Sequence, residues 1–368
     1  MKAKKQVLGL TPYKPGKPIQ EVKAELGLGE IIKLASNENP FGPSPKAKEA
    51  MIAASSSPEI YPDGYAARVR EAVAKELGVE KEQLIFGAGS DEVILMLCRT
   101  FLTPETNTVM AAPTFSQYKH NAVVEGTEIR EVPLTDGVHD LDAMLKEIDD
   151  ETRIVWVCNP NNPSGTYNNE EDFLRFLKQV PKDVLVVSDE AYIEYVTAED
   201  YPNTIELLDD YPNLIVLRTF SKAYGLAALR IGFGVASREL IRTVDPVRPP
   251  FNTTVMAHEA AIAALQDKDY VRQCHEKNKQ GLKEFTAFCK EEGLYYYPSQ
   301  ANFLLINTGI SGDVVFDSML KKGFILRSGE ALGFPNCVRI TIGDQEQNRK
   351  CMKALKETIE EAKTVAER

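Results

Sequence analysis

The chain has 368 residues, of which 43% are hydrophobic and 26% are charged, a composition typical of a folded globular protein. Its formal net charge of −11 opposes long-range attraction to nucleic acid and to anionic membrane surfaces, so we expect neither as a partner. No hydrophobic run approaches the length of a membrane span and the start lacks a signal-like apolar stretch, which predicts a cytoplasmic protein.

Residues 1–40 are rich in proline, glycine and lysine and show no helical or strand periodicity. Such a segment is typical of an arm that lies over another surface, often that of a partner subunit. We therefore expect an N-terminal arm over these residues.

Residues 41–246 change to alternating helices and short apolar strands. The clearest strands are 154–158, 184–188, 214–217 and 231–235, and an amphipathic helix is expected over 168–180. Strands that are apolar along their whole length and separated by helices favour a mostly parallel sheet covered by helices on both faces. These residues are predicted to form a large α/β domain.

A proline-rich break at 245–252 is the best candidate for a domain boundary. After it come long helical stretches at about 255–292, strand-like segments at 302–306 and 338–342, and a helix rich in lysine and glutamate. We expect residues 247–368 to form a smaller α+β domain. The six cysteines are widely spaced and the four histidines form no cluster, so neither a disulfide framework nor a metal site is predicted.

Ligands of open parallel sheets bind at the carboxyl ends of the strands, and four polar clusters follow strand-like runs here. In the first, Gly89, Ser90 and Asp91 lead into an apolar helix. Backbone N–H groups at such a helix start suit a phosphate. A plain glycine turn capped by Ser90 or Asp91 explains the same pattern.

The second and third clusters carry Asn162 and the run from Asp189 to Tyr192. Two Asn-Pro steps hold the backbone around Asn162 extended, which would aim its amide at a ligand, although a simple turn explains them too. Asp189 emerges from a buried strand, where a carboxylate needs a cation or several donors. It could equally cap the next element.

The fourth cluster runs from Thr219 through Ser221 and Lys222 to Arg230. A lone lysine is usually a solvated surface residue. Together, however, the four clusters meet the requirements of pyridoxal 5′-phosphate (PLP), namely an amine that bonds to it, an acid beside its ring nitrogen, and donors for its ring oxygen and its phosphate. Lys222 would be the amine and Asp189 the acid. Asn162 and Tyr192 would donate to the ring oxygen, and the phosphate would be bound by Gly89, Ser90, Ser221 and Arg230.

The sequence resembles the fold-type I PLP-dependent aminotransferases over essentially its whole length. The resemblance is carried by residues 34–45, 61–64, 89–92, 113–115, 161–165, 189–192, 221–230 and 338–340, and is greatest toward the histidinol-phosphate aminotransferase group. One departure is Ala228, where relatives commonly have glycine.

The resemblance implies further roles. Phe115 would stack on the cofactor ring, and Asp91 and Thr219 would join the cofactor site. Tyr61 would reach the cofactor phosphate of the neighbouring subunit, which makes a homodimer the functional unit. The substrate would be bound by Arg339, with Tyr13, Asn37 and Arg327 nearby.

The expected reaction is transfer of the amino group of L-histidinol phosphate to 2-oxoglutarate, giving imidazole acetol phosphate and L-glutamate, as in histidine biosynthesis. Lys222 would act as general base and acid, while Asp189 and Tyr192 complete the catalytic set. Three alternatives stay open: an aromatic amino acid aminotransferase, a PLP-dependent decarboxylase of a phosphorylated amino acid, and a non-catalytic PLP-binding regulator.

Overall fold

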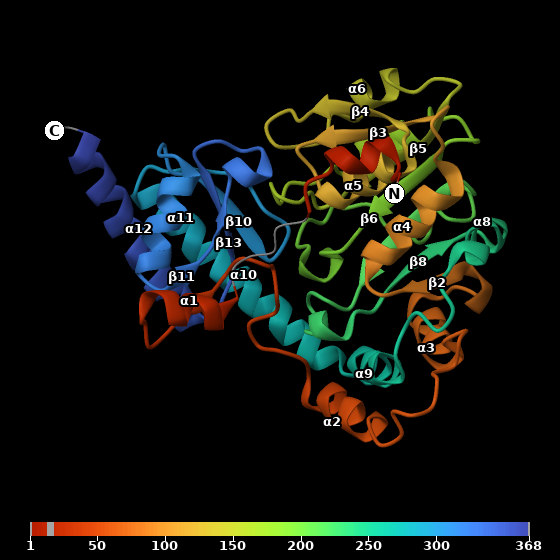
Figure 1. The fold of residues 1–368 in the computed structure, drawn as a ribbon, viewed down its shortest axis with the longest axis horizontal. Helices are drawn as coiled ribbons and strands as arrows, with labels where there is room; N and C mark the ends of the chain where they lie inside the picture. The colour runs from red at the N-terminus through yellow and green to blue at the C-terminus, as the bar shows by residue number, and fades with distance from the viewer. Residues whose placement is uncertain (1, 13–17, 367–368) are drawn as a thin grey trace.

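The computed structural model of the protein describes residues 2–12 and 18–366. Two sheets dominate the fold, one of seven strands and one of four, and the long helix α10 (Lys268–Glu291) extends between them (Figure 1). The predicted fold class is confirmed, because a mostly parallel sheet between helices is accompanied by a smaller antiparallel one.

The seven-stranded sheet contains all four strands expected from the apolar runs. In spatial order it consists of β2 (Leu84–Gly87), β8 (Gly232–Ala236), β7 (Leu214–Thr219), β6 (Leu185–Asp189), β5 (Thr152–Cys158), β3 (Asn107–Ala112) and β4 (Glu128–Pro133). Only β8 runs antiparallel to both of its neighbours. The reversal has a simple cause, since residues 220–231, which join β7 to β8, contain no crossover helix.

Both faces of this sheet are buried because successive strand residues point to opposite sides. On one face Val155 and Val186 pack with α2 (Pro45–Ala54), α3 (Ala67–Leu77), α6 (Leu141–Lys146), α7 (Glu170–Leu177) and α9 (Val255–Gln266). On the other face Trp156 and Val187 pack with α4 (Ser90–Phe101), α5 (Ser116–Glu125) and α8 (Arg238–Val244). Helix α7 corresponds to the helix expected at 168–180, with Asn169 as its cap.

The four-stranded sheet is antiparallel, in the order β12 (Arg327–Ser328), β13 (Cys337–Thr341), β10 (Phe303–Asn307) and β9 (Tyr295–Tyr296). Its core packs with α10, α11 (Gly312–Lys321) and α12 (Gln345–Ala366). The sequence indicated β10 and β13, but β9 and β12 are too short to show alternation. No helix within the described residues is both long and apolar enough to cross a membrane.

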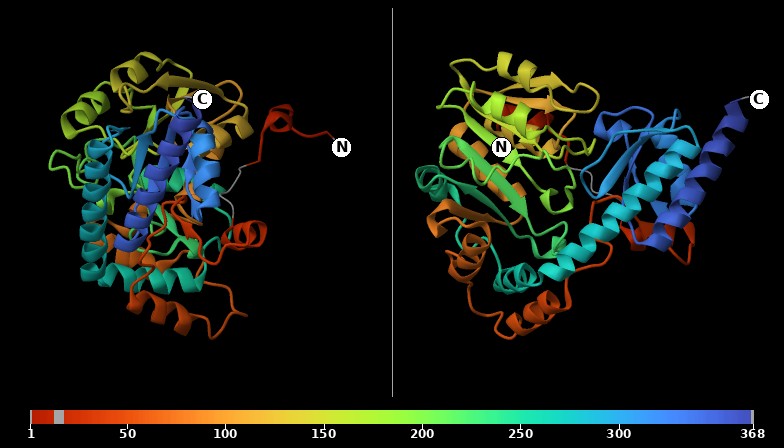
Figure 2. Two further views of the ribbon diagram at one scale, coloured as in Figure 1. Left: turned by 90° about the vertical axis from the view of Figure 1, so that its left-hand side faces the viewer. Right: turned by 180° about the vertical axis from the view of Figure 1, so that it is seen from behind.

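The N-terminal segment is more regular than expected. It contains a 3₁₀ turn, η1 (Lys5–Gly9), helix α1 (Ile19–Leu26) and strand β1 (Ile32–Lys33), which pairs in parallel with β11 (Phe324–Ile325). These elements gave no signal in the sequence, because an eight-residue helix and a two-residue strand are too short to show a period. Helix α1 packs with α11 and β11 in the C-terminal part of the molecule, whereas η1 contacts α5 on the outside of the larger part (Figure 2).

The domain boundaries at 40/41 and 246/247 stay predictions. Helix α9 follows the second of them, yet it packs on α2 and α3 beside the seven-stranded sheet. Helix α10 then leads to the smaller sheet after a break at Asp267.

Candidate active site

Lys222 lies in the loop between β7 and β8, past the carboxyl end of β7. Its side chain is half-buried, and Nζ donates to the backbone oxygen of Ser36 at 3.4 Å and lies 5.6 Å from the centre of the Tyr192 ring. Burial, helped by the positive charge of Arg339, lowers the pKa of Lys222 to about 8. A substantial fraction of the amine is therefore neutral near neutral pH.

Asp189 ends β6 and is only 3% exposed. Its carboxylate accepts a hydrogen bond from the Tyr118 hydroxyl at 2.6 Å and one from the backbone N–H of Ala191 at 3.2 Å. Burial raises the pKa of Asp189 to about 6, against the effect of the Tyr118 hydrogen bond. A carboxylate held this way is suited to pair with a positively charged nitrogen.

Tyr192 follows Asp189 on the turn after β6 and is buried. Its hydroxyl oxygen accepts from Asn37 Nδ2 at 3.0 Å, and burial raises the pKa of this tyrosine. Asn37 is fixed in turn by Thr341 of β13 and by Asn302. A short N-terminal segment thus joins the two sheets at this point.

A cradle of donors lies at the start of α4. The first-turn N–H groups of a helix have no intrahelical acceptor, and α4 begins at Ser90. Arg230 Nη1 donates to Ser221 Oγ at 3.4 Å, and Ser221 also receives the Thr219 hydroxyl at 3.0 Å. A Cβ at Gly89, whose φ is +80°, would lie 2.6 Å from Arg230 Nη2, so only glycine leaves this space open.

Two details of this cradle indicate a functional site. Arg230 has φ of +53°, a conformation that L-residues rarely adopt and that is enriched at functional sites. Asp91 Oδ2 lies 3.5 Å from Arg230 Nη2, and burial raises the pKa of this acid. The acid side chain would repel a phosphate, so Asp91 could contribute only through its backbone N–H.

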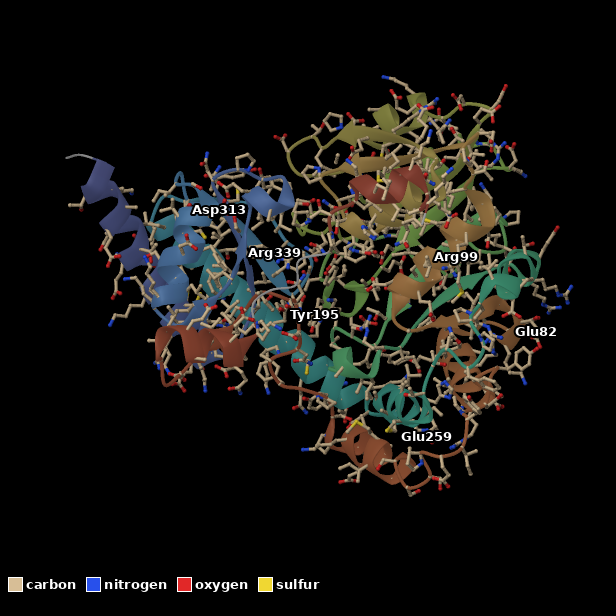
Figure 3. All side chains as sticks on the ribbon, in the orientation of Figure 1. Glu82, Arg99, Tyr195, Glu259, Asp313 and Arg339 are labelled. Carbon is tan, nitrogen blue, oxygen red and sulfur yellow. The ribbon has the colours of Figure 1, made fainter. Side chains whose placement is uncertain are left out.

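Arg339 lies on β13, on the side of the four-stranded sheet that is nearer the seven-stranded sheet (Figure 3). Its guanidinium donates to Asn162 Oδ1 at 2.6 Å and to the backbone oxygen of Ala35 at 2.7 Å. Arg327 is its Cα partner across β12 and β13, so two arginines stand side by side. Asn162 therefore bridges from the edge of the large sheet to the small one.

Most of the predicted site residues come together here. Phe115 is next to Tyr118, with ring centres 5.5 Å apart in an edge-to-face arrangement. Tyr61, which is expected at the cofactor site of a neighbouring subunit, is 78% exposed and stacks on Phe251. Tyr13 lies outside the described residues.

The residue that sequence reasoning missed is Tyr118, which contacts Asp189 directly. It is three residues after Phe115 on α5, and this helical spacing was the one signal that placed it near the site.

The arrangement fits PLP. The loop after β7 carries the amine of Lys222, the neighbouring strand β6 ends in a buried carboxylate, and the charges of Asp91 and Arg230 in the cradle act on the same amine. These are the groups that the ring nitrogen and the phosphate of PLP need.

Comparisons with known proteins agree with a PLP-binding site. The family model for class I and II aminotransferases matches residues 29–355. The chain belongs to this aminotransferase family. It is 61% identical to a histidinol-phosphate aminotransferase of Geobacillus sp. (strain WCH70), over 99% of this chain and 100% of that protein. It is also 61% identical to one of Halalkalibacterium halodurans, over 99% of each chain.

Among solved structures, the histidinol-phosphate aminotransferase of Sinorhizobium meliloti in complex with PLP matches with a TM-score of 0.89. It is 27% identical and the match covers 97% of each chain. The chain is thus a PLP-dependent aminotransferase, as the resemblance predicted.

A buried ion pair lies next to Asp189 in the active site of this aminotransferase. Glu190, next to Asp189, is 1% exposed and accepts from Arg218 Nε at 3.0 Å and Nη2 at 2.8 Å. The Thr204 hydroxyl also donates to Glu190. Because Arg218 belongs to β7 and Glu190 follows β6, the pair ties together the strand ends that carry the site.

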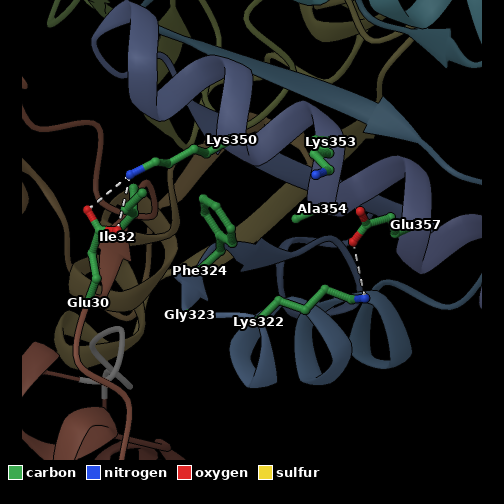
Figure 4. A pocket seen from close by; sticks show the side chains of 9 residues that line it. All are labelled: Glu30, Ile32, Lys322, Gly323, Phe324, Lys350, Lys353, Ala354 and Glu357. Carbon is green, nitrogen blue, oxygen red and sulfur yellow. Dashed lines mark hydrogen bonds and ion pairs between the residues drawn. The ribbon is translucent and has the colours of Figure 1, made fainter.

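Two hollows of about 290 Å³ lie apart from these residues. The first is lined by Glu30, Lys322, Lys350 and Glu357 among others, and Lys350 pairs there with Glu30 and Lys322 with Glu357 (Figure 4). The second is lined by Glu194, Tyr224 and residues of α9 and α10. Neither is lined by a residue of the cofactor cradle.

Proposed function

We propose that this aminotransferase transfers the amino group of L-histidinol phosphate to 2-oxoglutarate, as a cytoplasmic homodimer of histidine biosynthesis. The observation that carries the proposal is the position of Lys222: it follows β7, the strand beside the one that ends at Asp189, and its amine lies over the Tyr192 ring within the electrostatic influence of Arg339. The relatives named above support the choice of substrate.

The cofactor would be held at both ends by groups of this chain. Asp189 would pair with its ring nitrogen, Asn162 and Tyr192 would bind its ring oxygen, and Phe115 would cover its ring. The phosphate would lie at the start of α4, with donors from Gly89, Ser90, Asp91, Thr219, Ser221 and Arg230. Bound there, PLP supplies an electron sink that makes the hydrogen on the substrate's amine-bearing carbon acidic.

Lys222 is the acid–base group that transfers the proton of the substrate's amine-bearing carbon. With a pKa of about 8, Nζ exists partly as a free base and partly as an ammonium near neutral pH. It can therefore take the proton from the substrate carbon and later return one, as acid–base catalysis requires. The Tyr192 ring and the Ser36 carbonyl beside it restrict where the amine can point.

Arg339 and Arg327 would bind the anionic group of each substrate. Guanidinium groups form paired hydrogen bonds with phosphate and with carboxylate, so one site accommodates both histidinol phosphate and glutamate. The contacts of Arg339 with Asn162 and Ala35 fix its orientation before a substrate arrives. Asn37 donates a hydrogen bond to the Tyr192 hydroxyl and would therefore lie beside the bound substrate.

An exposed apolar surface supports the homodimer. Tyr61 and Phe251 stack on each other while both stay exposed, and Ile52, Ile60 and Tyr65 are exposed too; exposed apolar surface of this kind marks interaction sites. Tyr61 is 78% exposed, which suits a residue that serves the cofactor phosphate of a partner subunit.

A substrate comparison tests the proposal. We expect kcat/KM for histidinol phosphate to exceed that for phenylalanine and tyrosine by at least about tenfold, since those amino acids lack the phosphate dianion. Each half-reaction is followed by the absorbance of the bound cofactor, with Lys222→Ala as the inactive control. A preference for the aromatic amino acids would reject the substrate, and release of carbon dioxide would indicate a decarboxylase.

A further inference from the structure

Tyr118 is buried beside Asp189 in the active site. Its side chain is fully buried, and its ring stacks on Trp156 with centres 4.7 Å apart and planes 13° from parallel. Trp156 is fixed by its own hydrogen bond, from Nε1 to Thr108 Oγ1 at 2.8 Å. The Tyr118 hydroxyl therefore has little freedom to move relative to β5 and β6.

That hydroxyl meets one oxygen of Asp189. It donates to Oδ2 at 2.6 Å, whereas Oδ1 accepts from the Ala191 backbone at 3.2 Å. Each carboxylate oxygen thus has one fixed donor, and the two donors together set the plane of the group. Without the hydroxyl, only the backbone contact would orient the carboxylate.

We propose that Tyr118 is the positioning residue of Asp189: its hydroxyl fixes the charged carboxylate that meets the ring nitrogen of PLP. The inference rests on the proposed role of Asp189 and adds a residue to it. Because Tyr118 is fully buried and its hydroxyl is bonded to Asp189, its role is exerted through the acid.

The charges around Asp189 explain why a donor is needed there. Burial, Asp91 and Glu190 all raise the pKa of Asp189, and the Tyr118 hydroxyl is the strongest group that lowers it. Cys158 of β5 also adjoins the pair and stays a neutral thiol, because burial raises its pKa to about 12. Tyr118 remains a donor throughout the neutral range, since burial and Asp189 raise its own pKa.

The variant Tyr118→Phe keeps the ring on Trp156 and removes only the hydroxyl. We expect the holoenzyme to bind PLP about 10- to 100-fold more weakly, the range for losing a hydrogen bond to a charged group. The acid limb of the kcat/KM profile should move to higher pH, because Asp189 would then take up a proton more readily. A purely structural tyrosine would leave this limb in place.

Tyr167→Phe is the matched control, because Tyr167 also donates to an aspartate, Asp200, at 2.7 Å but on the exposed surface. It should change neither PLP affinity nor the pH profile. The proposal is overturned if Tyr118→Phe behaves like this control. A Tyr118→Phe chain that does not fold would overturn it too, because the hydroxyl would then be a requirement of the fold.

Asp189→Asn separates this inference from the proposed function. If Asp189→Asn loses PLP affinity and turnover while Tyr118→Phe does not, only the role of Tyr118 is wrong. If Asp189→Asn keeps both, the assignment of Asp189 itself fails.

Discussion

The lowered pKa of Lys222 predicts how the apoprotein reacts with PLP. Only a neutral amine attacks an aldehyde, and the pKa of Lys222 falls from an ordinary 10.5 to about 8 through burial and the nearby Arg339. At pH 7 roughly one Lys222 in ten is neutral, against fewer than about one in a thousand ordinary lysines. Covalent attachment at this lysine should therefore be about a hundredfold or more faster than at a surface lysine.

Arg339→Met isolates the charge effect, because methionine fills much of the space without the charge. The pKa of Lys222 should rise, yet stay below 10.5 because burial still acts. A rise of one unit lowers the neutral fraction near pH 7, and hence the attachment rate, by about tenfold.

The assay mixes apoprotein with PLP over a range of pH, reduces the bond with borohydride, and quantifies the modified Lys222 peptide by mass spectrometry. The titration of PLP itself is common to all proteins and cancels in the ratio of variant to parent. Arg327→Met is the control, since it removes the same charge one strand further out. The reasoning is refuted by a parent midpoint near 10.5, or by an Arg339→Met midpoint equal to that of the parent.

Three more predictions concern stability and cofactor affinity. Arg218→Met should cost about 3–5 kcal/mol of unfolding free energy in urea, because it leaves the Glu190 carboxylate buried without its partner. The double variant with Glu190→Gln should recover part of this loss, and equal losses would contradict the argument. One carboxyl oxygen of Glu194 is buried without a hydrogen-bond partner, and burial raises the pKa of this acid to about 7. The folded protein therefore favours the protonated, neutral form of Glu194. The resulting contribution to the free energy of unfolding is present below about pH 4.5 and is lost as pH rises through about 7. Glu194→Gln should therefore melt at a higher temperature than the parent near pH 8 but not near pH 4.5, and a constant difference across this range would reject the assignment. Gly89→Ala should weaken PLP binding at least about tenfold in equilibrium dialysis, because its Cβ would displace a guanidinium of the cradle, whereas Gly78→Ala, with a similar φ and nothing within 4 Å, should bind PLP normally.

The local features of the site followed from the sequence. Asp189 ends the strand of one apolar run and Lys222 lies in the loop that follows the next, and the carboxyl ends of neighbouring parallel strands meet at one edge of a sheet. Their proximity could therefore be predicted without knowing any contact. The turn from Gly89 to Ser90 before α4 was recognised in the same way, because a glycine at a helix start is a local signal.

The pairings between distant segments were decided by the tertiary structure. Asn162 meets Arg339 across 177 positions of the chain, and Asn37 meets Tyr192 across 155. Tyr118 reaches Asp189 only because α5 lies on the Trp156 face of the sheet. The sequence by itself determined which groups stand at the strand ends, since that depends on local periodicity. How those groups are oriented and charged depends on packing between elements, which no local pattern records.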